Sequence, residues 1–174
     1  MVRLMSGGPG KFGALLALPL AALASTPASA ATANASVNAN IVKPVVFTAT
    51  GSLNFGTIVT NNLTANRTVS LSPTNVLTCG GSSELICSGA TSVPTYNVQG
   101  TNKQVITIIK TPSTLRNSLN GATLTLTPIG PSSITLTNSG APGESFAIGG
   151  SFTITPTTGE GVYSGVVDVT VDYQ

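Results

Sequence analysis

The stretch Thr123-Leu124-Thr125-Leu126-Thr127 decides the fold class, because polar and apolar side chains alternate in it at every position. Strict alternation is typical of a β-strand with one face in a core and the other in solvent. The same period of two recurs elsewhere, at Val69 and Leu71, at Tyr96 and Val98, and from Phe146 to Ile154. We therefore predict an all-β protein.

Clusters of Pro, Gly and Asn separate these runs, for example at Asn120-Gly121 and Pro142-Gly143. After residue 30, no segment keeps a helical spacing of apolar residues over three turns. Short strands between frequent turn signals predict an immunoglobulin-like antiparallel β-sandwich, here spanning residues 45–174. Within it, residues 105–109 are apolar on both faces except for Thr107, so we expect a central strand there.

The composition excludes several classes of function. Of the 174 residues only 7% are charged, and neither His nor Trp occurs. Seven Lys and Arg residues are too few for a nucleic-acid footprint. Without His the chain lacks the commonest general base and the commonest metal ligand. We expect no enzyme activity, no cofactor and no metal site.

The first 30 residues are typical of a secretory signal peptide. Arg3 and Lys11 precede an apolar run over residues 12–23, and Ala28-Ser29-Ala30 fits a cleavage site. The alternative is an uncleaved N-terminal anchor. Cleavage would leave five basic and five acidic residues, hence no net charge and no membrane-spanning segment. We expect a secreted protein that passes through a periplasm to the cell surface or a fimbrium.

Export bears on Cys79 and Cys87, the only two cysteines. In an oxidising compartment a close, even pair predicts a disulfide. A redox or zinc role is disfavoured, because the spacing is not C-x-x-C and no His could complete the site.

No catalytic set can be assembled from the remaining residues. The faint phosphate-loop pattern at residues 7–11 lies inside the signal peptide. Asp168 and Asp172 share a strand face, but four residues of strand separate them by roughly 13 Å, which does not suit a retaining pair of carboxylates. Two solvated acids are the simpler interpretation.

The most specific pattern lies in residues 161–174. One face of the expected strand carries the candidate assembly residues Gly161, Tyr163, Gly165, Val167, Val169, Val171 and Tyr173. Polar side chains dominate the other face. Near the start of the sandwich stands a second short motif, Leu53-Asn54-Phe55-Gly56.

These motifs resemble those of two protein families. A penultimate Tyr173 and a Gly161 fourteen positions from the end resemble the last strand of chaperone–usher fimbrial (pilin) subunits. The L-[DN]-F-G motif at residues 53–56 and the ending G-x-Y-x-G-x-x-x-V-T-V-x-Y at residues 161–173 are similar to those of a secreted bacterial domain family of unknown function.

The fimbrial resemblance implies an incomplete sandwich that a neighbour's N-terminal extension completes. Residues 31–44 would be that extension, and its candidate donor residues alternate with Asn and Ser: Ala35, Val37, Ala39 and Ile41. Strand addition of this kind combines main-chain hydrogen bonds with side chains that fill pockets. Alternatively, residues 35–42 are the domain's own first strand, and the sequence leaves both possibilities open.

We therefore expect a structural subunit of a bacterial fimbria or similar secreted assembly, with a role in cell adhesion. The resemblance implies copies of the chain or related subunits as partners, together with a periplasmic chaperone and an outer-membrane usher. The alternative is a self-contained secreted sandwich that binds a surface polymer or glycan. The absence of Trp and the scarcity of Tyr disfavour that alternative.

Overall fold

The computed structural model of the protein describes residues 30–81 and 83–174. Two units divide the chain, residues 1–39 and residues 40–174. In the first unit the described residues 30–39 are all exposed and form no regular secondary structure. The expected signal peptide, apart from Ala30, lies outside the described residues. The second unit consists of β-strands and loops.

The described residues of the second unit form fourteen strands. They are β1 (Val46–Thr50), β2 (Thr57–Thr60), β3 (Arg67–Leu71), β4 (Leu77–Cys79), β5 (Leu85–Ser88), β6 (Thr95–Gln99), β7 (Val105–Thr111), β8 (Ser113–Asn117), β9 (Thr123–Ile129), β10 (Ser133–Thr135), β11 (Glu144–Ala147), β12 (Gly149–Ile154), β13 (Tyr163–Ser164) and β14 (Asp168–Tyr173).

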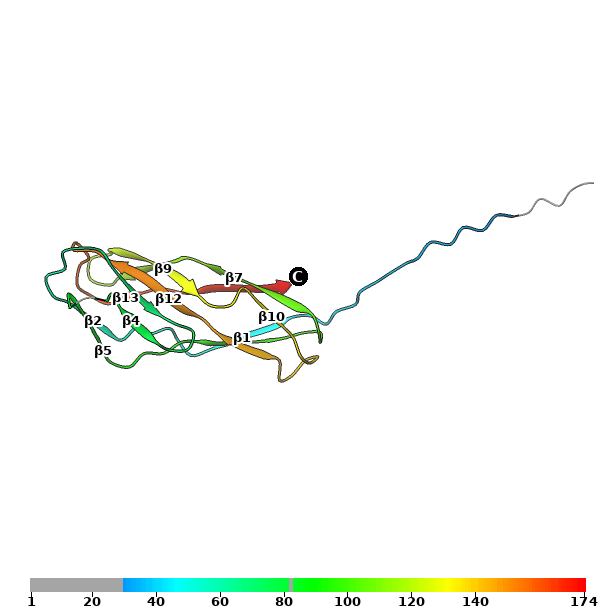
Figure 1. The fold of residues 1–174 in the computed structure, drawn as a ribbon, viewed down its shortest axis with the longest axis horizontal. Coiled ribbons are helices and arrows are strands. Elements are labelled where there is room, and N and C mark those ends of the chain that lie inside the picture. Colours follow the sequence, from blue (N-terminus) through cyan, green and yellow to red (C-terminus); the bar gives the residue numbers. More distant parts are fainter. Residues whose placement is uncertain (1–29, 82) are drawn as a thin grey trace, which may run out of the picture. The chain divides into compact units, whose positions relative to one another are not determined.

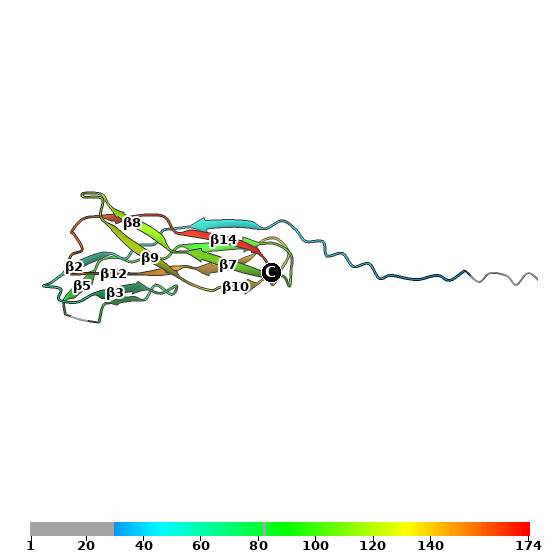
Figure 2. The same ribbon diagram turned by 90° about the horizontal axis from the view of Figure 1, so that it is seen from above.

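Antiparallel hydrogen bonding orders these strands as β1-β6-β11, β2-β5, β10-β7-β14 and β13-β8-β9-β12-β3-β4. Along the chain β7 runs on into β8, β9 into β10 and β13 into β14, so the last two sheets form one layer. An isolated bridge between Asn54 and Ser92 likewise joins the first two sheets into the other layer. The fold is thus an all-β sandwich, as the alternation predicted (Figures 1 and 2).

One long strand crosses between the layers. β11 pairs with β6 in the first layer, whereas β12 pairs with β3 and β9 in the second. Gly149 lies at the crossing, where a Cβ atom would stand 1.9 Å from the Leu71 carbonyl oxygen. Only glycine therefore permits this close approach of two backbones.

Two apolar clusters fill the space between the layers. The first includes Val98, Ile106 and Ile148, and the second includes Val69, Leu126 and Phe152. Their members come from the alternating stretches, so the period of two correctly identified the buried face of most strands. The central strand expected at residues 105–109 is present as β7, although Ile109 on its outer face is 56% exposed. β7 lies between β10 and β14 within its layer, but its outer face meets solvent.

β1 with β2 forms one edge of the first layer, and β13 with β14 forms one edge of the second. Both figures place β2, β5 and β13 toward one end of the sandwich, and the C-terminus near the start of β1 toward the other end. The arrangement of these two edges positions the candidate site.

Candidate functional site

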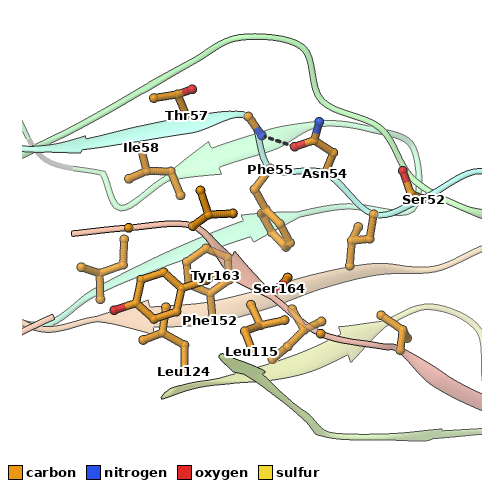
Figure 3. A pocket seen from close by; sticks show the side chains of 18 of the residues that line it. Ser52, Asn54, Phe55, Thr57, Ile58, Leu115, Leu124, Phe152, Tyr163 and Ser164 are labelled. Atoms are coloured by element: carbon orange, nitrogen blue, oxygen red, sulfur yellow. Dashed lines mark hydrogen bonds between the residues drawn. The ribbon is translucent and has the colours of Figure 1, made fainter. Parts of the chain in front are cut away.

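An open groove of about 790 Å³ separates the two strand edges. Residues 51–58 line one wall, and residues 158–167 line the other. The inner faces of β8, β9 and β12 supply the floor, with Leu115, Leu124 and Phe152 (Figure 3). The groove is therefore a place where part of the core between the layers lacks a cover.

The floor of the groove is apolar. Phe55 meets Phe152 edge to face, with ring centroids 4.8 Å apart. Leu115 and Leu124 pack against the second core cluster but remain only half-buried. Tyr96 also lines the groove, and burial raises the pKa of its phenol. Covering a surface of this kind with another apolar side chain lowers the free energy.

Each wall contains one short strand that pairs on one side only within the described residues, and the rest of each wall is loop. β2 pairs with β5, and β13 pairs with β8. No strand pairing joins β1 or β2 to β13 or β14 in this part of the chain. An edge strand presents backbone groups that have no strand partner on one side, and it is therefore a template for adding a strand.

The first wall contains the Leu53-Asn54-Phe55-Gly56 motif. The Asn54 side-chain Oδ1 accepts a hydrogen bond of 2.9 Å from the Gly56 N–H, which forms a local turn. Gly56 has a φ of +74°, and a Cβ there would stand 2.4 Å from the Ser88 carbonyl oxygen. The turn leaves Phe55 pointing into the groove (Figure 3).

The second wall contains the start of the C-terminal motif. The Tyr163 hydroxyl donates a hydrogen bond of 2.8 Å to the Gly159 carbonyl oxygen. Buried Asn117 donates 2.8 Å to the Glu160 carbonyl oxygen and accepts 2.8 Å from the Leu119 N–H. Asn117 therefore fixes the segment that leads into β13, a role that no signal in its sequence neighbourhood indicated.

The residues of the predicted assembly face differ in their burial, and Gly161 and Gly165 are exposed. Tyr163, Val167, Val169, Val171 and Tyr173 are half-buried, and the residues between them are exposed. The strand is interrupted between β13 and β14, where Gly165 lies close to β8. A Cβ at Gly165 would stand 2.6 Å from the Thr114 carbonyl oxygen, so this position needs glycine.

The groove is closed at the end where β14 finishes. Val45 and Phe47 pack there on the same core cluster as Val169, Val171 and Tyr173. Both edges pack on this cluster at this end, where the Tyr173 hydroxyl also donates a hydrogen bond to the Lys43 carbonyl oxygen, and the groove opens toward β2 and β13. The groove therefore has one closed end and one open end.

The groove is almost free of charge. Among the described residues that line it, Glu160 carries the only carboxylate, and none is Lys or Arg. Within the described residues no group of three His, Cys, Asp or Glu side chains could hold a metal ion. Asp168 and Asp172 are both exposed on β14, on the face away from the core. The groove is suited to apolar contacts and backbone hydrogen bonds.

The predicted disulfide is present and joins the two layers. Cys79 in β4 bonds Cys87 in β5, with Cα atoms 5.9 Å apart. Beside it, Arg67 donates two hydrogen bonds to Glu84, and the Thr64 hydroxyl donates a third. The hydroxyl of Thr64 and the guanidinium of Arg67 lower the pKa of Glu84 to about 2. Together these bonds tie down the loops between β2 and β5.

The predicted donor residues belong to no helix or strand. Ala35, Val37, Ala39 and Ile41 are exposed, and Val37 and Ile41 are each 90% exposed. We refer to residues 31–42 as the N-terminal arm. The arm forms no strand of the domain, and the first strand begins at Val46.

No described helix of the chain is long and apolar enough to cross a membrane.

The fold and the groove define a β-sandwich domain with one uncovered stretch of core. The chain belongs to the family described as Domain of unknown function (DUF4402), which it matches over residues 45–173. No curated protein and no solved structure matches it.

Proposed function

We propose that the protein is a structural subunit of a fimbria or a similar secreted assembly, and that the groove receives the N-terminal arm of a neighbouring copy. One observation carries the proposal. The two motifs, residues 53–56 and residues 161–165, are far apart in sequence but form opposite walls of one groove with an apolar floor. The domain thus has the features of an immunoglobulin-like sandwich that lacks a strand between its two edges.

The arm fits this groove in length, polarity and charge. Twelve residues in extended form span about 40 Å, whereas the eight residues of the first wall span at most about 26 Å. Apolar side chains at alternate positions would face the floor, and the Asn and Ser side chains between them would face solvent. Neither the arm nor the groove floor carries a charge that would be buried unpaired.

The arrangement of the ends favours head-to-tail assembly. The arm joins the domain at the closed end of the groove, while a strand from outside has access at the open end. A contact between two different surfaces of identical subunits repeats from one copy to the next, and it builds a filament when the rotation between copies does not close into a ring. Export by the predicted signal peptide, passage with a periplasmic chaperone and an outer-membrane usher, and a place on the cell surface all belong to this proposal.

A self-contained, glycan-binding sandwich is the alternative. Tyr163 and Phe55 could stack on a sugar, but the groove floor has few polar side chains to hold hydroxyl groups. This alternative predicts a monomer whose arm has no partner.

The test compares two substitutions at adjacent arm positions in the otherwise full chain from Ala31. Val37→Asp places a charge on the face that would meet the groove, whereas Asn38→Asp places the same charge on the opposite face. We expect Val37→Asp to abolish assembly in light scattering and Asn38→Asp to preserve it. Equal effects of the two variants, or a monomeric unsubstituted chain, would remove the support for strand exchange.

A peptide of residues 31–42 provides the complementary test. Added to the Val37→Asp chain, whose own arm cannot donate, the peptide should raise the melting temperature. A glycan-binding domain would show no such shift.

A further inference from the structure

Three chain segments meet at the root of the N-terminal arm. The Tyr173 hydroxyl donates a hydrogen bond of 2.6 Å to the Lys43 carbonyl oxygen and accepts one of 2.9 Å from the Thr101 N–H. The Lys43 N–H donates a bond of 2.6 Å to the Thr101 Oγ1 atom. We call Lys43, Thr101 and Tyr173 the Tyr173 clamp. Both backbone groups of Lys43 are therefore engaged by the domain.

The domain is shaped to receive the Tyr173 side chain. Gly100 is buried, and a Cβ there would stand 2.4 Å from the Tyr173 hydroxyl oxygen and 2.9 Å from the Leu136 Cδ1 atom. Any other residue at position 100 would displace the hydroxyl from Lys43 and Thr101. The ring of Tyr173 also packs against the first core cluster, at the closed end of the groove.

This clamp opposes a return of the arm into its own groove. The arm joins the domain at the closed end, and β1 begins only three residues after Lys43. To enter its own groove, the arm would have to reverse near Lys43 and Pro44 and run antiparallel to β1. A hairpin there would need the Lys43 backbone groups, which are bonded to Tyr173 and Thr101.

Pro44 opposes the same reversal. Tight hairpin turns need a positive φ at the first central residue, and type I′ turns need it at the second as well. Proline holds its own φ near −65° and restricts the preceding residue to extended conformations. Neither Lys43 nor Pro44 can therefore easily occupy the central positions of such a turn.

We infer that the Tyr173 clamp and Pro44 are positioning elements that keep the arm out of its own groove, so that the acceptor of each arm is a second copy of the chain. The inference rests on the proposed function. It assigns to Tyr173 a role at the root of the arm that is separate from the wall of the groove. Each chain then retains one free arm and one open groove, as head-to-tail assembly requires.

The test measures where the arm goes when the clamp is broken in the full chain from Ala31. Hydrogen exchange of arm residues 33–41 is followed at dilutions where light scattering shows only monomer. In the unsubstituted monomer these amides should exchange freely. Tyr173→Phe and Thr101→Val each remove one hydrogen bond to the Lys43 backbone, and each should raise the fraction of monomer with a protected arm by about fivefold. Thr101→Ser keeps the hydroxyl and should behave like the unsubstituted chain.

A gain-of-function variant keeps the inference falsifiable if the clamp variants are unstable. Lys43→Asn combined with Pro44→Gly introduces the pair that favours a type I′ turn. This variant should be a monomer at all concentrations, with a protected arm and a raised melting temperature. A protected arm in the unsubstituted monomer, or no increase in either kind of variant, would overturn the inference.

The two proposals can fail separately. If the arm of the unsubstituted monomer is protected and Val37→Asp releases it, the groove still accepts a strand but the clamp does not direct it. If Val37→Asp assembles like the unsubstituted chain and the peptide of residues 31–42 has no effect on melting, strand acceptance fails and the inference fails with it.

Discussion

Shortening the apolar side chains of the arm should weaken its binding to the groove by an amount that the structure sets. Val37 and Ile41 are each 90% exposed before binding, so nearly all of their side-chain surface is available for burial. Each methylene equivalent that becomes buried contributes about 0.8 kcal/mol. Val37→Ala removes two carbons and should cost about 1.6 kcal/mol, or about 15-fold in Kd. Ile41→Ala removes three carbons and should cost about 2.4 kcal/mol, or about 50-fold.

The assay uses labelled peptides of residues 31–42, acetylated and amidated so that no terminal charge is introduced. Their binding to the Val37→Asp chain is measured by fluorescence anisotropy. An Asn38→Ala peptide serves as the matched control, because Asn38 would face solvent, and its Kd should change less than threefold. If Asn38→Ala weakens binding as much as Val37→Ala does, the arm does not bind as an alternating strand and the reasoning fails.

Three further predictions concern the stability of the domain. Cys79→Ser with Cys87→Ser should lower the free energy of unfolding by about 2.5 kcal/mol in denaturant titrations, because the unfolded chain regains the conformational entropy that the short disulfide loop removes. An unchanged denaturation midpoint would contradict this prediction. The pKa of Glu84 falls from 4.5 to about 2 on folding, so its contribution to stability is present above pH 4.5 and is lost as the pH falls toward 2. Glu84→Gln should reduce the change of the melting temperature with pH over that range. An unaltered pH dependence of the melting temperature would count against the Arg67 and Thr64 contacts. Leu126 is 2% exposed, so Leu126→Ala should cost about 2–5 kcal/mol, whereas half-buried Leu124→Ala should cost clearly less until the groove is filled.

The fold class could be predicted from the sequence because alternation is a local signal. Leu126 and Phe152 lie in the core where the period of two placed them, and the cysteine pair indicated its disulfide. The central position of β7 followed from its apolar run, but the exposure of Ile109 did not, because an apolar run does not reveal whether a second layer covers its outer face. In this fold the space outside β7 remains open to solvent.

The groove could not be predicted from the sequence, because it depends on which strands form the edges of the two layers. The Leu53-Asn54-Phe55-Gly56 motif was visible, but the direction of Phe55 follows from the turn at Gly56. The bond between Tyr173 and Lys43 joins residues 130 positions apart, so no local pattern indicates it. The requirement for glycine at position 100 likewise follows only from the packed Tyr173 ring.

The central claim, that one chain's arm fills another chain's groove, can be tested by complementation between two defective chains. Val37→Asp leaves a groove without a working arm. Ile58→Asp places a charge on the half-buried first wall of the groove and leaves the arm intact. Circular dichroism first establishes that both variants are folded, and light scattering then measures their masses separately and mixed. The account predicts two monomers that combine into a one-to-one heterodimer. Failure of the folded variants to combine, or assembly of either variant alone as readily as the unsubstituted chain, would contradict the account.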